Sequence, residues 1–223
     1  MSLAPTLEDI PIIDVDTHVS EPGDLWTTRI SSKYRDMAPH LVRDPDGRDI
    51  WTVSDKRLAS PGVFATAGWP EYAPSHPKTL AEADPATWNP VDRLVRMDEY
   101  GLYAQVLYPN ILAFYLPTFL SMGNPDFVAD CIRAYNDFLV EFASADPERL
   151  LPMMLLPVWD MERCLAEFER CRDAGHRGVV LASTFAKIGL PPLWDRYWDR
   201  LFGASQEAGM SINFHVGFSE LTE

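Results

Sequence analysis

The sequence predicts an α/β fold in which parallel strands close into a barrel. From about residue 90 onward, apolar runs alternate regularly with amphipathic segments, a pattern typical of parallel strands joined by right-handed helical crossovers. An open doubly wound sheet shows the same alternation, but neither glycine-rich nucleotide-binding motif, G-x-G-x-x-G or G-x-x-x-x-G-K-S/T, follows a predicted strand. Polar residues also gather at the carboxyl ends of the first and fifth strands, where barrel enzymes place their chemistry. Both observations favour the barrel.

The first strand is predicted over residues 11–18 (PIIDVDTH), a short apolar run whose last residues are polar. The stretch 19–89 that follows is too long for an ordinary connection, so we expect an excursion or lid above the first strand. Inside it, the turn-forming tetrapeptide at 44–47 (DPDG) separates residues 40–43 from residues 48–53 and predicts a hairpin.

Helix start signals divide the rest of the chain. Asn89-Pro90 and Asn124-Pro125 each place an N-cap before a proline suited to the first helical turn, and Asp160 is a third N-cap. The expected helices cover residues 90–101, 125–146, 161–175 and 193–208, and the expected strands cover residues 103–109, 150–157, 178–183 and 211–216. The last helix is expected to bury four aromatic residues at helical spacing: Trp194, Tyr197, Trp198 and Phe202.

Composition restricts the class of protein. The chain has 223 residues, of which 47% are hydrophobic, and 19 basic against 33 acidic residues give a formal net charge of −14. A folded domain is therefore expected, and the acidic balance argues against nucleic acid or anionic membranes as main partners. Three cysteines without C-x-x-C spacing favour a reducing compartment. Because no apolar stretch is long enough to cross a bilayer, we expect a soluble, cytoplasmic protein.

Three residues at strand ends suggest a metal site. Asp16 and His18 are two positions apart on the first strand, so their side chains should point the same way. His215 ends the fifth strand and should reach the same rim, which would give one oxygen and two imidazole donors suited to Zn²⁺ or a similar ion. The alternative is structural: Asp16 would cap a loop, and both histidines would be satisfied core residues.

Other polar and aromatic residues could contact a substrate. Asn110 directly follows the second strand, while Trp69 and Phe114 lie in loops after the first two strands. Together with neighbouring aromatic residues they could form an apolar pocket for an aromatic or unsaturated acid. Lid packing, or burial at a subunit contact, explains the aromatic residues equally well. Glu21 could orient a ligand through hydrogen bonds or could simply belong to its loop.

Five segments give the chain a family resemblance over most of its length: residues 13–22 (IDVDTHVSEP), 96–101 (RMDEYG) leading into 106–109 (VLYP), 146–150 (DPERL), 174–179 (AGHRGV) and 214–217 (FHVG). They resemble the amidohydrolase superfamily, in the branch of aminocarboxymuconate semialdehyde decarboxylase and the resorcylate decarboxylases. The resemblance implies a metal-dependent (β/α)₈ barrel and homo-oligomers. It also implies one divalent ion on Asp16, His18 and His215, preferably zinc, with manganese, iron and magnesium as alternatives.

The sequence departs from this family pattern in three ways. The first metal position is Asp16, where relatives often have His or Glu, and Ser183 ends the fourth strand without the bridging lysine of two-metal relatives. The family's acid or base histidine after strand six, and its aspartate after strand eight, would fall beyond Glu223. We therefore expect one incomplete barrel domain over residues 1–223, holding about the first five βα units.

The function expected from these observations is metal-dependent decarboxylation or hydrolysis of a small carboxylated substrate, aromatic or unsaturated. A non-catalytic binding or interaction protein, or an inactive fragment of such an enzyme, is the alternative.

Overall fold

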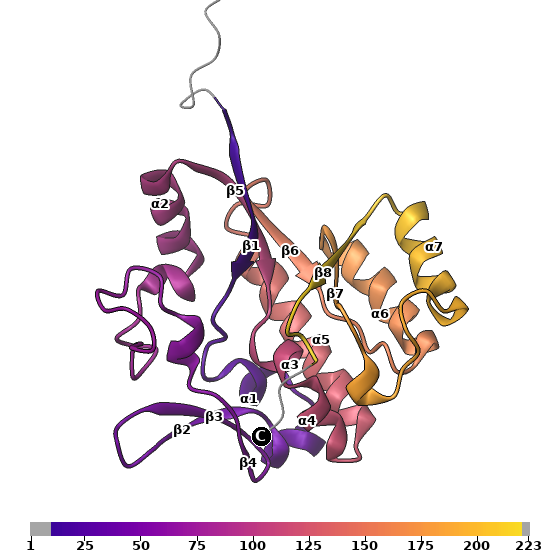
Figure 1. Ribbon diagram of the computed structural model, residues 1–223, viewed down its shortest axis with the longest axis horizontal. Helices are drawn as coiled ribbons and strands as arrows, with labels where there is room; N and C mark the ends of the chain where they lie inside the picture. Colours follow the sequence, from indigo (N-terminus) through magenta and orange to yellow (C-terminus); the bar gives the residue numbers. More distant parts are fainter. Residues whose placement is uncertain (1–9, 220–223) are drawn as a thin grey trace, which may run out of the picture.

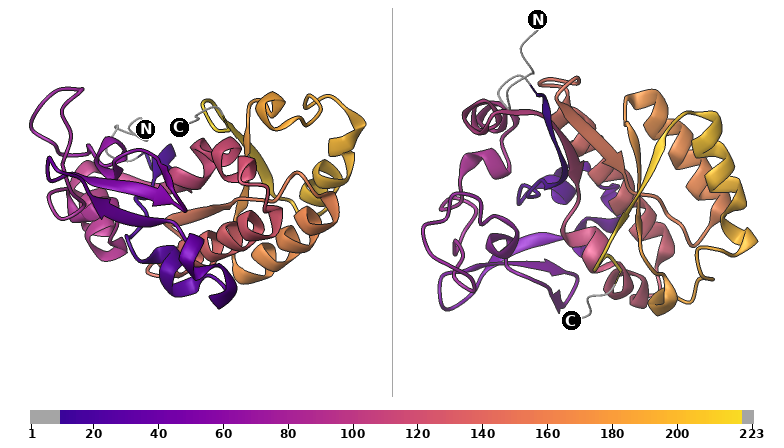
Figure 2. Two further views of the ribbon diagram at one scale, coloured as in Figure 1. Left: turned by 90° about the horizontal axis from the view of Figure 1, so that it is seen from below. Right: turned by 45° about the horizontal axis from the view of Figure 1, so that its top comes forward.

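A computed structural model describes residues 10–219. At its centre is a sheet of five parallel strands, in the order β1-β5-β6-β7-β8 (Figure 1). The strands are β1 (Ile12–His18), β5 (Leu102–Tyr108), β6 (Leu150–Met154), β7 (Gly178–Ala182) and β8 (Ser211–His215). Neighbours in the sheet follow one another in the predicted barrel order, and every pair is parallel. The sheet curls, and helices cover its outer side (Figure 2), which confirms the predicted α/β fold as a half-barrel of five parallel strands.

The helices connect successive strands. They are α2 (Pro90–Tyr100), α3 (Ile111–Phe114), α4 (Leu116–Ser121), α5 (Pro125–Ala143), α6 (Met161–Ala174) and α7 (Asp199–Glu207). The long helix α5 packs on the sheet with an almost continuously buried face that includes Phe127, Tyr135 and Phe142. Within residues 10–219, none of the helices has the length and apolar character to cross a membrane.

The predicted N-caps fix where the helices begin. The side chain of Asn89 accepts hydrogen bonds from the backbone N–H groups of Val91 and Asp92, and Asn124 and Asp160 accept in the same way at α5 and α6. These bonds satisfy donors that have no partner inside the helix.

We expect Asn89→Ala to lower the free energy of unfolding by about 1 kcal/mol, because two N–H groups of α2 lose their acceptor. Asn89→Asp keeps an acceptor at the same place and should lose much less. Urea denaturation of the two variants checks this, and an equal loss in both would contradict the capping role.

The excursion after β1 contains the predicted hairpin and several elements that were not predicted. Strands β2 (His40–Arg43) and β3 (Asp49–Val53) pair antiparallel around the expected turn, and β4 (Lys56–Arg57) adds a third strand. A short helix, α1 (Leu25–Arg29), precedes them. Trp26 of α1 and Trp51 of β3 are both fully buried and pack edge to face. The indole N–H of Trp26 also donates to the Cys131 carbonyl oxygen of α5, which attaches the excursion to the rest of the molecule.

The last predicted helix is shorter than expected. Residues 193–195 are not helical: a 3-10 turn begins at Arg196 and α7 at Asp199. The cause is Asp195, whose backbone is extended and whose side chain accepts a hydrogen bond from the Tyr197 N–H, so it starts the turn instead of continuing a helix. Trp198 is fully buried as predicted, but Trp194 is 89% exposed, and its assignment to the core was wrong.

Candidate metal centre

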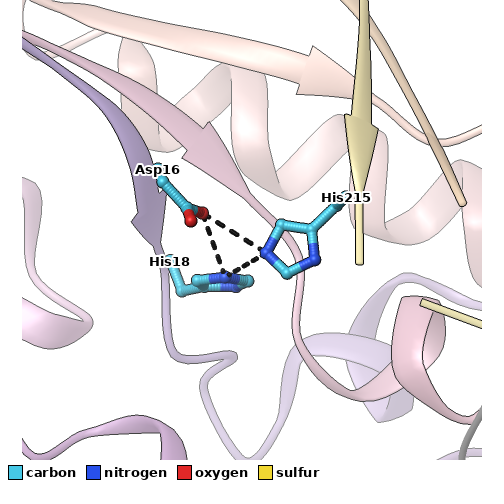
Figure 3. A group of neighbouring side chains, drawn as sticks. All are labelled: Asp16, His18 and His215. Atoms are coloured by element: carbon cyan, nitrogen blue, oxygen red, sulfur yellow. Dashed lines mark hydrogen bonds and ion pairs between the residues drawn. The ribbon is translucent and has the colours of Figure 1, made fainter. Parts of the chain in front are cut away.

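Asp16, His18 and His215 come together at the carboxyl ends of β1 and β8 (Figure 3). Nε2 of His18 lies 3.1 Å from Nε2 of His215. Oδ1 of Asp16 lies 3.3 Å from Nε2 of His215 and 3.7 Å from Nε2 of His18. Donor atoms that bind one ion at about 2.0–2.2 Å are separated by roughly 3–4 Å, so the three atoms fit a single divalent ion.

An irregularity in β1 aims these side chains. Asp14 pairs with Gln105 and Thr17 with Leu107, so β1 advances three residues where β5 advances two. This is the register of a β-bulge, which redirects side chains at a strand end. Asp14 stabilises it, because its carboxylate accepts hydrogen bonds from the backbone N–H of Asp16 and from the hydroxyl of Thr17.

Backbone contacts select the tautomer of both imidazoles. Nδ1 of His18 lies 2.9 Å from the carbonyl oxygen of Pro109, and Nδ1 of His215 lies 2.6 Å from that of Val216. Because a carbonyl oxygen only accepts, each neutral ring carries its proton on Nδ1 and presents an unprotonated Nε2. Two nitrogen lone pairs and a carboxylate oxygen therefore face one another, an arrangement that a cation would stabilise.

The imidazoles lie in a less polar environment than the carboxylate. The side chains of His18 and His215 are 23% and 13% exposed, whereas that of Asp16 is 67% exposed. Burial lowers the pKa of His18, and the neighbouring ring of His215 lowers it further, although the Pro109 carbonyl and Asp16 act in the opposite direction. A neutral His18 is the form in which imidazole binds a metal.

Aromatic rings surround the two histidines. Phe114 stacks on His18, with ring centroids 5.9 Å apart, and Phe218 stacks on His215 at 4.0 Å. Phe64, from the excursion, stacks in turn on Phe114 at 5.5 Å. Phe218 was not predicted from the sequence, although its position three residues after His215 was a usable signal.

A cleft of about 410 Å³ opens beside this group. Its lining includes Asp16, His18, Phe64, Arg96 and Gln105, so it combines an aromatic wall with charged and amide groups. The cleft is large enough for a small carboxylated molecule.

The three residues predicted to contact a substrate occupy different places. Phe114 lies in the aromatic group, as just described. Asn110 is buried behind His18, where its side-chain N–H donates to the Val19 carbonyl oxygen. Trp69 lines another surface hollow, with Glu82 among its neighbours, and its indole N–H donates to Ser75. The substrate-binding roles of all three residues remain predictions.

The other histidines are not part of the group. His176 is buried at the start of β7, and its Nδ1 lies 3.2 Å from the Cys171 carbonyl oxygen. Burial lowers the pKa of His176 to about 4, which keeps the ring neutral. Nδ1 of His40 lies 2.9 Å from the Ala38 carbonyl oxygen, in the hairpin.

Glu21 is a buried carboxyl group in contact with the turn that follows β5. It is 2% exposed, and its Oε1 accepts hydrogen bonds from the backbone N–H groups of Asn110 and Ile111, at 2.9 and 3.0 Å. Burial raises the pKa of Glu21 from 4.5 to about 7, because desolvation of the charged form outweighs these hydrogen bonds.

This raised pKa predicts a pH-dependent stability. The unfolded chain releases the Glu21 proton near pH 4.5 and the folded chain near pH 7, so the folded state binds more protons between these values. The free energy of unfolding should therefore fall as pH rises from about 4.5 to 7, by on the order of 3 kcal/mol from this group. Glu21→Gln should remove that component. Urea denaturation of both proteins at pH 5 and pH 8 tests it, and a difference that does not change with pH would contradict it.

Comparison with known proteins identifies the family. The family model for amidohydrolases matches residues 13–223. The chain belongs to the amidohydrolase family. This confirms the resemblance drawn from the sequence motifs.

One curated relative of this chain is a decarboxylase. The chain is 30% identical over 113 residues to a gamma-resorcylate decarboxylase of Polaromonas sp., a match over 48% of this chain and 33% of the relative. Among solved structures, an amidohydrolase from Mycobacterium avium subsp. paratuberculosis shares the fold with a TM-score of 0.70 at 19% identity, over 92% of this chain and 58% of that one.

A second solved structure carries a metal. It is a dihydroxybenzoic acid decarboxylase from Polaromonas sp. with bound manganese and the inhibitor 2-nitroresorcinol, similar with a TM-score of 0.54 and 18% identity over 92% of this chain and 49% of that one. The amidohydrolase chain described here thus spans about a third of the curated relative and half to three fifths of the two solved structures.

Proposed function

We propose that this chain binds one divalent metal ion through Asp16, His18 and His215, and that it contributes this site to an enzyme acting on a small carboxylated substrate. The observation that carries the proposal is the convergence of Oδ1 of Asp16 with two unprotonated Nε2 atoms. A bound divalent ion would supply Lewis-acid stabilisation of negative charge that develops on the substrate. Zinc suits the two imidazoles and one carboxylate, and the manganese of the solved decarboxylase makes manganese the second candidate.

The residues around the ligands have separate roles in this proposal. The Pro109 and Val216 carbonyl oxygens hold the rings of His18 and His215 with Nε2 toward the shared centre. Phe114 and Phe218 cover the outer faces of those rings and keep water from them. Phe64, Phe114 and the adjacent cleft offer a flat apolar surface to an aromatic or unsaturated acid.

Decarboxylation is favoured over hydrolysis as the reaction. The support is the similarity to gamma-resorcylate decarboxylase and to dihydroxybenzoic acid decarboxylase, together with an aromatic wall suited to a benzoic acid.

Two measurements test the proposed function. After dialysis against a chelator, calorimetric titration with Zn²⁺ or Mn²⁺ should show one ion bound per chain. The loaded protein is then incubated with 2,6-dihydroxybenzoate, and release of CO₂ is measured beside hydrolysis of an N-acyl aromatic amide. Absence of stoichiometric binding would overturn the metal site. Metal binding without either reaction would favour the alternatives, a non-catalytic binding protein or an inactive fragment of such an enzyme.

A further inference from the structure

Glu21 binds the turn that follows β5. The backbone N–H groups of Asn110 and Ile111 point to its Oε1, and both lie where α3 begins and N–H groups have no partner inside the helix. With 2% exposure, Glu21 leaves little room for water to replace it as the acceptor. This single oxygen therefore holds two backbone donors of the turn in place.

The same turn supports His18. The Pro109 carbonyl oxygen, one residue before the first of these N–H groups, lies 2.9 Å from Nδ1 of His18. Two more bonds join the turn to the segment after β1: the side chain of Asn110 donates to the Val19 carbonyl oxygen, and the Val19 N–H donates to the Tyr108 carbonyl oxygen. The contacts form a continuous path from Glu21 to the imidazole of His18.

A second contact of His18 depends on the same turn. Helix α3 starts at Ile111, whose N–H is held by Glu21, and it ends at Phe114, whose ring stacks on His18. Movement of the turn would thus shift both the hydrogen-bond acceptor of Nδ1 and the ring that packs against the imidazole.

We propose that Glu21 is a positioning residue for His18. Its carboxyl oxygen fixes the turn at residues 109–111, the turn fixes the Pro109 carbonyl oxygen, and this oxygen holds His18 in the Nδ1–H form with Nε2 toward the metal site. The inference rests on the proposed metal-binding function, although the orientation of His18 can also be measured without metal.

Two replacements of Glu21 distinguish the effect of its hydrogen bonds from the effect of its side-chain volume. Glu21→Gln keeps an oxygen acceptor, whereas Glu21→Met has a similar length and none. Loss of a group that orients a metal ligand lowers metal affinity about 10–100-fold, so Glu21→Met should weaken Zn²⁺ binding at least about tenfold. Glu21→Gln should bind Zn²⁺ like the unaltered chain. Competition with a chromophoric chelator measures both dissociation constants.

A spectroscopic measurement reports the orientation directly. In the metal-free chain labelled with ¹⁵N-histidine, the His18 imidazole should show the Nδ1–H tautomer. Glu21→Met should give a mixture of tautomers, and Glu21→Gln should not. If Glu21→Met does not fold, Glu21→Asp is used instead, because the shorter aspartate side chain cannot accept from both N–H groups. An unchanged dissociation constant for Zn²⁺ and an unchanged His18 tautomer in Glu21→Asp would overturn the proposal.

Asn136→Leu is the matched control for a purely structural effect. Asn136 is also buried and also binds backbone groups, since it accepts from the Leu155 N–H and donates to the Leu155 carbonyl oxygen, beyond the end of β6. The Asn136→Leu variant should lose stability and keep its affinity for Zn²⁺. Equal weakening in Asn136→Leu and Glu21→Met would overturn the positioning role. If the unaltered chain binds no metal, the proposed function fails, and the tautomer of His18 still decides the role of Glu21.

Discussion

Replacement of His18 by alanine is expected to weaken divalent-metal binding by more than about 100-fold, beyond the range seen when only a group that orients a ligand is lost. The reason is geometric. Nε2 of His18 lies within 4 Å of both other donor atoms, and without it only His215 and the largely exposed Asp16 remain. Chelator competition with Zn²⁺ and Mn²⁺, followed by elemental analysis of the dialysed protein, measures the loss.

His40→Ala is the control for this experiment. His40 is also partly buried and hydrogen bonded, to Ala38 and close to Thr52, but it belongs to the β2–β3 hairpin and not to the metal-binding group. Its replacement should leave the affinity for metal unchanged. If His18→Ala and the unaltered chain bind the ion equally well, the site lies elsewhere in the molecule.

Local signals in the sequence predicted most of the central sheet. Asn89, Asn124 and Asp160 could be recognised as N-caps because an N-cap bonds to its own helix, so nothing distant is needed to specify it. The strands between the helices are short apolar runs such as residues 178–182, and all five positions of β7 are buried. Their alternation with helices leads to the observed strand order.

One helix that depends on a distant contact was missed, and the start of another helix was misplaced. Helix α1 has five residues, too few to show helical periodicity, and its place depends on the packing of Trp26 against Trp51. The spacing of Trp194 and Trp198 does not show that Asp195 caps the turn between them. The first contact is distant in the sequence, whereas the second is a local cap that the helical spacing of the aromatic residues conceals.

The grouping of the candidate ligands could be predicted because the carboxyl ends of parallel strands meet at one rim. Its details could not. The bulge in β1 depends on pairing with β5, where Asp14 and Thr17 face residues only two positions apart. The protonation of His18 likewise depends on the carbonyl oxygen of Pro109, a residue 91 positions away in the chain.

Replacement of Arg93 is expected to cause the largest loss of stability among these variants. Arg93 is 6% exposed, and its guanidinium donates to the carbonyl oxygens of His18, Thr87 and Ala86 and to the side chain of Gln105. Burial lowers the pKa of Arg93 to about 10, opposed by Asp14 and Asp84, so it stays charged at neutral pH. Arg93→Met would remove a donor from all four acceptors, of which only the Thr87 carbonyl oxygen keeps another partner among the described residues, the Ser20 N–H. The free energy of unfolding should therefore fall by about 3–5 kcal/mol.

Arg93→Lys and Arg200→Met show whether this loss arises from the shape of the buried guanidinium. A lysine keeps the charge but has all its donors on one nitrogen atom. It therefore cannot reach the acceptors on β1, on β5 and in the turn at residues 85–87 at the same time. The Arg93→Lys variant should lose most of the stability that Arg93→Met loses. Arg200 forms an exposed ion pair with Glu162, and its replacement should cost less than about 1 kcal/mol. Urea denaturation at pH 7 compares the three variants. Arg93 also donates to the carbonyl oxygen of His18, at the end of β1. If Arg93→Met loses no more stability than Arg200→Met, then the end of β1 is held by its pairing with β5 alone.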